Sequence, residues 1–177
     1  KSFLDLNSRW GQTLYVNYRQ TPFGGDYNAE QFSAQSNLYF PGAIRHHSVR
    51  LSGVFQHNKN SEYEFSSPIN FTRGYGYVSF DQYYNLGFNY KLPVLYTDLH
   101  LGPIFNLQRI YVNGFYDYGV GKNDGEAQID IQSYGAEVSF NFNLFRLIPL
   151  IDMGVRYSYL PDRDDEVIEV IFGGVTF

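Results

Sequence analysis

Residues 132–144 read QSYGAEVSFNFNL, and the alternation of side chains in this stretch decides the fold class. Tyr134, Ala136, Val138, Phe140 and Phe142 recur at every second position, whereas serine, glycine, glutamate and asparagine residues take the positions between them. Successive side chains of a β-strand point to opposite faces, so this period of two predicts a strand with one apolar and one polar face.

The same alternation continues outward along the chain in both directions. Each strand is close to the ~9–11 residues that a tilted strand needs to cross a bilayer. We find no helix of useful length and no domain linker, so residues 1–177 are expected to form one domain. The eight expected strands cover residues 12–21, 31–40, 47–57, 83–92, 106–118, 132–144, 150–160 and 166–177.

Composition narrows the class of protein further. The net charge of −5 gives no basic footprint for nucleic acid, and the absence of cysteine excludes disulfides and thiolate metal sites. The chain has 17 Tyr and 16 Phe, a mean hydropathy of −0.33, and no run of the ~20 apolar residues that a transmembrane helix needs. Strands that alternate between lipid-facing and lumen-facing residues have this composition. The sequence therefore predicts an antiparallel transmembrane β-barrel in a bacterial (Gram-negative) outer membrane, surrounded by outer-membrane lipid.

The connections between the expected strands differ in length from one side to the other. The longest covers about residues 56–83, whereas residues 41–45 and 146–149 form short turns. Outer-membrane barrels combine long extracellular loops with short periplasmic turns, so both ends of the chain are expected on the periplasmic side. The last strand finishes on Phe177, with Val175 on the same face. This ending resembles the signal by which outer-membrane barrels are recognised for assembly.

The longest loop contains the sequence FTRGYGY at residues 71–77. Arg73 carries a rigid fork of donors that is always charged, and the glycines beside it permit φ > 0 and close backbone approach. If the loop folds inward, Arg73 requires carboxylates. The polar faces of the fifth, sixth and seventh strands offer Asp117, Glu137 and Asp152. The alternative is a mobile surface loop in which the Arg-Gly pair has no role.

Two motifs at linked positions carry a family resemblance. Arg73-Gly74-Tyr75 resembles the R-G-[FY] motif of the BamA/TamA-type outer-membrane barrel superfamily, also described as bacterial surface antigen barrels. The sequence FYDYG, from Phe115 through Asp117 to Gly119, matches the F-x-D-x-G motif of the same family. In that family the loop precedes strand twelve of sixteen and the second motif lies on strand thirteen. The resemblance thus implies that this chain corresponds to strands nine to sixteen, the carboxyl-terminal half of the barrel.

The resemblance also implies a function. It suggests that the loop folds into the lumen, where Arg73 meets acidic side chains of the barrel wall. It implies that the protein assists insertion or transport of unfolded outer-membrane or secreted polypeptides, without a cofactor and without enzymatic activity. The first eight strands and the periplasmic domains of the family are not in this sequence. Two architectures follow: a half-barrel completed by further strands of the same or another chain, or a self-closed eight-strand barrel.

Other functions remain open from the residues alone. A small structural or adhesive barrel would have the same strand pattern. A lipid-modifying enzyme would need a nucleophile near a histidine, and His57, close to Glu62 and Glu64, is the best-placed histidine, although no nucleophile motif flanks it. The acidic residues between 162 and 166 are either solvated or hold a hard cation such as Ca²⁺.

Overall fold

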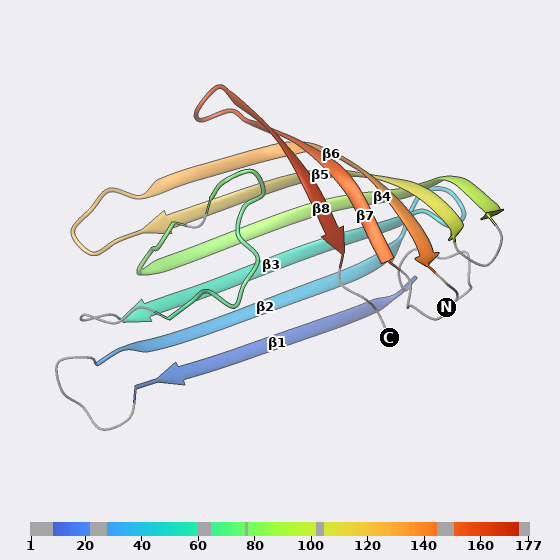
Figure 1. Cartoon of the computed structure of the whole chain (residues 1–177). Helices are drawn as coiled ribbons and strands as arrows, with labels where there is room; N and C mark the ends of the chain where they lie inside the picture. Colours follow the sequence, from blue (N-terminus) through green and yellow to red (C-terminus); the bar gives the residue numbers. More distant parts are fainter. Residues whose placement is uncertain are drawn as a thin grey trace.

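The computed structural model describes residues 9–21, 28–59, 65–76, 78–101, 105–144 and 151–173. These residues form eight antiparallel β-strands in a single sheet, in which each strand pairs with the next along the chain (Figure 1). Within the described residues, no helix is long and apolar enough to cross a membrane. The strands are β1 (Gly11–Gln20), β2 (Glu30–Pro41), β3 (Ser48–Lys59), β4 (Gln82–Leu101), β5 (Phe105–Lys122), β6 (Ile129–Leu144), β7 (Ile151–Leu160) and β8 (Asp165–Gly173).

The sheet is bent into a trough, and β7 and β8 turn over its hollow (Figure 1). Within the described residues β1 pairs only with β2 and β8 pairs only with β7, so the sheet is open along two edges. The all-β, antiparallel prediction is confirmed. The self-closed eight-strand barrel is not what these strands form.

The predicted strands match the observed ones except around two connections. Between the fifth and sixth strands, β5 continues to Lys122 and β6 already begins at Ile129, so the predicted strands were too short there. The larger difference lies between β4 and β5. Sequence reasoning ends the fourth strand before Pro93, but β4 continues through Pro93 to Leu101 and stays paired with β5. Register shifts between Pro93 and Leu95, and again between Tyr96 and Leu99, accommodate the missing proline donor as bulges. The predicted end of the last strand, with Val175 and Phe177, lies outside the described residues.

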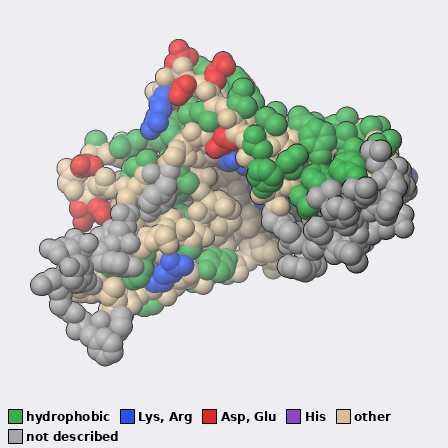
Figure 2. Space-filling view, in the orientation of Figure 1, with side chains coloured by type: hydrophobic (Ala, Val, Ile, Leu, Met, Phe, Trp, Pro, Cys, Tyr) green, Lys and Arg blue, Asp and Glu red, His purple; other side chains and the backbone are tan. Residues whose placement is uncertain are grey.

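The two faces of the sheet differ in polarity as the alternation predicts. The inner face, which lines the trough, buries polar side chains such as Ser33, Asn89, Asn113, Ser133 and Ser158. Figure 2 shows hydrophobic side chains gathered on the outside of the molecule beside a hollow that is mostly polar. The outer face of the strands exposes Leu14, Val16, Tyr18, Leu38, Leu51, Leu86, Phe88, Tyr116, Tyr134, Val138, Met153, Val155, Tyr157, Ile168, Val170 and Phe172.

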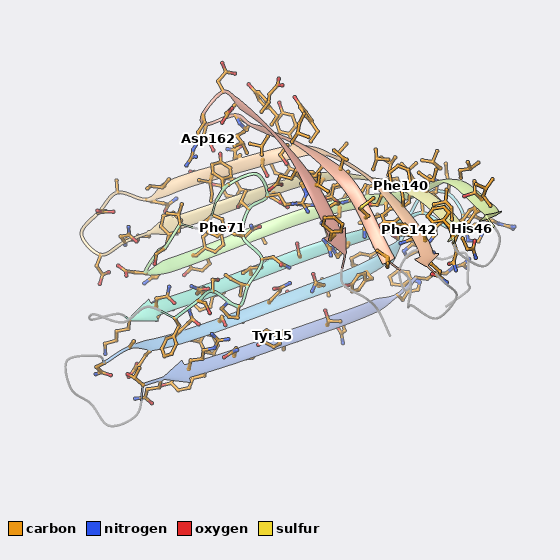
Figure 3. All side chains as sticks on the ribbon, in the orientation of Figure 1. Tyr15, His46, Phe71, Phe140, Phe142 and Asp162 are labelled. Atoms are coloured by element: carbon orange, nitrogen blue, oxygen red, sulfur yellow. The ribbon has the colours of Figure 1, made fainter. Side chains whose placement is uncertain are left out.

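The connection from β3 to β4 folds back into the trough, where Figure 3 shows Phe71 inside the hollow. The ring of Phe71 stacks on Tyr83 with centroids 4.4 Å apart, and Phe80 stacks on the same tyrosine at 6.0 Å. These side chains belong to a hydrophobic cluster with Ile131 and Leu160. The buried apolar core therefore lies between the loop and the inner face of the sheet.

Two glycines of β5 provide the space in which the loop rests. A Cβ atom at Gly119 would lie 2.5 Å from Thr72 Oγ1 and 2.8 Å from Ile131 Cγ1, and a Cβ atom at Gly121 would lie 2.4 Å from the Phe80 ring. All three distances are shorter than real Cβ contacts. The inner face of β5 must therefore lack side chains at these two positions, although Phe115 and Asp117 of the same face contact the loop.

We expect Gly119→Ala to lower the free energy of unfolding by about 1–3 kcal/mol, because the added methyl group overpacks the contact with Thr72. The measurement is the urea midpoint of the chain in detergent micelles. Gly114→Ala is the matched control, since a Cβ atom on that residue of the same strand meets nothing within 4 Å. Equal midpoints for the two variants would contradict this account of loop seating.

Candidate functional site: the Arg73 clamp

Arg73 lies in a tight turn at the inner end of the loop. The Tyr75 amide donates to the Thr72 carbonyl at 3.4 Å, and Gly74 adopts a φ of 80°. A Cβ atom at Gly74 would also lie 2.9 Å from Leu160 Cδ2. Glycine is required there both by the left-handed backbone and by the close approach to β7.

The guanidinium of Arg73 binds the carboxylate of Asp117 with two parallel bonds. Arg73 Nε donates to Asp117 Oδ2 at 2.7 Å, and Nη2 donates to Oδ1 at 2.8 Å. The Arg73 backbone amide donates to the same Oδ2 at 3.3 Å. Asp117 is only 4% exposed, so water competes little for this pair. Three bonds to one carboxylate hold both the side chain and the backbone of the turn.

Two further contacts hold the guanidinium, one on its face and one at Nη1. The ring of Phe115 lies 3.8 Å below its central carbon, a cation–π contact, and Nη1 donates to Glu137 Oε1 at 3.1 Å. Burial alone lowers the pKa of Arg73, but the hydrogen bond and charge of Asp117, followed by those of Glu137, outweigh it and raise the pKa. Arg73 is therefore a permanent cation at the centre of the site.

From Glu137 the ion pairs continue across the sheet to its edge. Arg156 Nε donates to Glu137 Oε1 at 2.7 Å, and Arg156 Nη1 donates to Glu169 Oε2 at 3.1 Å. The three residues stand opposite one another on β6, β7 and β8. Asn113 of β5 completes the arrangement by donating to Glu137 Oε2 at 2.7 Å. The loop is thus linked electrostatically to all strands from β5 to β8.

A second anchor lies beside the arginine. The Thr72 amide donates to the hydroxyl oxygen of Tyr83 at 3.0 Å, and the two hydroxyl groups are 2.8 Å apart. Asn85 Nδ2 donates to both of these oxygens, at 3.0 and 2.9 Å. Because all three residues are buried, these bonds fix the turn against β4 without competition from water.

A third anchor joins the loop to the turn between β7 and β8. The Tyr75 hydroxyl lies 3.0 Å from Asp162 Oδ2 and 3.1 Å from the Gln132 carbonyl oxygen, and Asp162 also accepts from the Gln132 amide at 2.8 Å. Figure 3 shows Asp162 at this turn. Arg163 lies 4.9 Å over the Tyr75 ring. Burial, followed by the hydrogen bond to Asp162, raises the pKa of Tyr75 to about 12.

The structure brings together most, but not all, of the residues singled out in the sequence. Arg73 contacts Phe115, Asp117 and Glu137 directly, and we call these four residues the clamp. Asp152 is not part of the clamp: it accepts a hydrogen bond from Tyr111 and lines a separate, adjoining cavity. Gly76 has no left-handed φ and open space around its Cα, so Gly74 is the glycine that the turn requires.

The residues considered for other chemistry lie apart from the clamp. His57 is exposed on the outer face of β3, opposite Phe32, on the side away from the trough. Among the described residues, no group of three or more histidine, cysteine or acidic residues is arranged to hold a metal ion. In the acidic turn, Asp162 is engaged by Tyr75 and Asp164 accepts from the Tyr159 hydroxyl at 2.7 Å.

Several contributors to the clamp were not singled out in the sequence. Arg156 and Asn113 lie within predicted strands, and their pairing with Glu137 depends on the strand register. Gly87 has no local signal: a Cβ atom there would lie 2.9 Å from Asp117 Oδ1, so this glycine makes room for the carboxylate. The role of the Tyr83 hydroxyl likewise appears only once the loop is folded over β4.

Comparisons with family models, with curated proteins and with solved structures find no match for this chain. What the fold defines directly is an all-β protein built from one open, eight-stranded antiparallel sheet with a loop clamped on its inner face.

We predict that Arg73→Glu destabilises the chain by about 3–5 kcal/mol, because Asp117 and Glu137 would remain buried without their cation. The loop would also leave the trough, and limited proteolysis at residues 65–76 would become faster. Arg73→Lys is also expected to be less stable than the parent and to have a less protected loop, since a single ammonium group cannot reproduce the two-pronged contact.

The control for this prediction is Arg45→Glu, which makes the same charge change at an exposed turn between β2 and β3. It is expected to change neither stability nor loop cleavage. An Arg73→Glu chain that folds with the same loop protection as the parent would show that the clamp does not hold the loop.

Tyr75 makes a pH-dependent contribution with a definite sign. Its pKa is raised to about 12 from 10.0, so the stabilisation is complete below pH 10 and is lost as pH rises towards 12. The difference in urea midpoint between the parent and Tyr75→Phe should therefore shrink across this interval. A difference that stays constant from pH 9 to 12 would show that the Tyr75–Asp162 contact does not make this pH-dependent contribution to stability.

Proposed function

We propose that this chain forms part of the wall of a bacterial outer-membrane β-barrel that assists insertion or translocation of polypeptides, as BamA/TamA-type barrels do. The observation that carries the proposal is the contact of Arg73 with Asp117. It joins the two motifs on which the resemblance rests, through a loop folded onto a polar inner face.

The polarity of the sheet supports a membrane location. Sixteen large apolar side chains on the outer face of the strands are each at least 36% exposed. A soluble protein rarely leaves so extended an apolar surface uncovered, whereas lipid covers it at no cost. The polar face with its charges of both signs is then the lumen side.

The open edges support the half-barrel arrangement. Edge strands with unpaired backbone groups are not stable in the hydrocarbon core of a membrane. Each unpaired group there costs several kcal/mol (about 4–8 in alkane). The trough also has to hold the loop, for which an eight-strand barrel offers little room. We therefore propose that further strands, of the same or another chain, pair with β1 and β8 and close a barrel of about sixteen strands.

In this proposal, the role of the clamp is to fix the position of the loop. An ion pair buried this deeply is a poor source of net stability, because desolvation offsets much of the attraction. Its effect is to select one position of the loop. A loop held in that position keeps the lumen side of β4 to β8 in a defined shape, against which a polypeptide can be guided.

The decisive experiment purifies this chain from membranes together with the strands that close its barrel, reconstitutes the assembly into liposomes, and adds a urea-unfolded outer-membrane barrel protein as client. We expect the client to fold faster than in empty liposomes. Folding is measured by the shift in gel mobility of the unheated client. Arg73→Glu should lose that acceleration and Arg45→Glu should keep it.

Equal folding rates with and without the chain would reject the insertion function and leave a structural or adhesive barrel. Turnover of liposome lipid that disappears in His57→Ala would favour the enzyme instead. Acceleration that survives Arg73→Glu would separate the activity from the clamp.

A further inference from the structure

Two cations on the inner face of the sheet stand outside the clamp. Arg50 of β3 and Lys91 of β4 line the same polar cavity of about 340 Å³ as Arg73 and Arg156. The three carboxylates of that cavity are all engaged by Arg73 and Arg156. They are Asp117, Glu137 and Glu169. In the part of the chain that the structure describes, no ion pair joins Arg50 or Lys91 to a carboxylate.

The strand register places these two cations close together. Arg50 stands opposite Asn89, and Lys91 lies two residues further along β4 on the same face. Diagonal neighbours of this kind lie roughly 7–8 Å apart, within reach for long side chains. Two positive charges at such a distance repel each other, and the low polarity of a partly buried position increases the repulsion.

Two buried donors at this position have no acceptor. Arg50 Nε is buried and has no hydrogen-bond partner. The amide nitrogen of Asn89, a residue with 0% exposure, is also buried without a hydrogen-bond partner. The amide oxygen of Asn89 already accepts from Asn113 Nδ2 at 3.2 Å, so its nitrogen is the group left over. Buried donors are nearly always paired, and a group of unpaired ones calls for an acceptor.

The nearest remaining acidic residue does not supply that acceptor. Asp152 lines the adjoining cavity of about 410 Å³ together with Lys91. One of its carboxylate oxygens accepts from Tyr111 and the other has no partner. Lys91 is instead positioned by the Tyr111 ring, whose centroid is 5.2 Å from Nζ.

We propose that Arg50 and Lys91, supported by the Asn89 amide, form a binding site for an oxyanion in the trough. A guanidinium beside an ammonium group is suited to a carboxylate or a phosphate, both of which accept several charge-assisted hydrogen bonds. The ligand is either a free inorganic oxyanion or the carboxylate of an acidic side chain on a polypeptide that enters the cavity. This site is independent of the insertion function proposed above, since it follows from the two cations and the unpaired donors that line the cavity.

The test is calorimetric titration of the full chain in detergent micelles, with ionic strength held constant by sodium chloride. Inorganic phosphate is one probe, and N-acetyl-aspartate amide, which mimics an acidic side chain, is the other. We expect saturable binding of at least one probe, weakened about tenfold or more by Arg50→Gln and by Lys91→Gln. Arg45→Gln and Lys122→Gln remove the same charges at exposed positions and are expected to leave binding unchanged.

Each result bears on the proposal. Binding of phosphate alone assigns a free oxyanion, and binding of the aspartate amide assigns an acidic polypeptide segment. Absence of saturable binding of both probes, or equal weakening in the exposed controls, overturns the site.

A second measurement covers variants that fail to fold. Phosphate should raise the thermal midpoint of the parent chain more than chloride of equal ionic strength. Without anion, Arg50→Gln and Lys91→Gln should have midpoints at or above that of the parent, because one of two repelling charges is gone. A parent midpoint that responds equally to the two salts would contradict the proposal on its own.

Discussion

The contact on which the rest of this structure depends is the two-pronged bond between Arg73 and Asp117. It is buried, charged on both sides, and reinforced by the Arg73 backbone amide. Neither partner tolerates the loss of the other, because a buried charge without compensation is far more costly than the intact pair is stabilising. The pair therefore selects one position of the loop in the trough, in which Phe71 and Phe80 stack on Tyr83.

The sheet itself is organised around the same constraint. Apolar side chains cover its outer face, while amides, hydroxyl groups and charges line its inner face, the reverse of a soluble β-sandwich. Such an inner face needs partners for its polar groups, and the loop supplies them along β4 and β5. In the cavity beside the loop, Arg50 Nε and the Asn89 amide nitrogen remain unpaired. The same principle thus explains both the clamp and the position of the proposed oxyanion site.

Sequence reasoning reached the strands and the polarity of their faces because both depend on a local period of two. It reached the link between Arg73 and the carboxylates of β5 and β6 because those residues lie on predicted inner faces. It was wrong where distant pairing overrode a local signal. Pro93 normally ends a strand, yet continued pairing of β4 with β5 carries the strand past it as a bulge. Asp152 lies on the predicted inner face, but its position along β7 places it beside Tyr111, away from Arg73.

By itself the sequence determined that this is an antiparallel all-β protein with one apolar and one polar face, since alternation is written residue by residue. It also predicted that Arg73 would meet acid if the loop folded inward, because an arginine cannot be neutralised. Only the tertiary structure decided which acids these are, since Asp117, Glu137 and Arg156 come together through the register of three strands. The open edges, the space left by Gly87 and Gly119, and the unpaired cations were likewise decided there. Each depends on distances between segments far apart in the chain, and no local pattern encodes such distances.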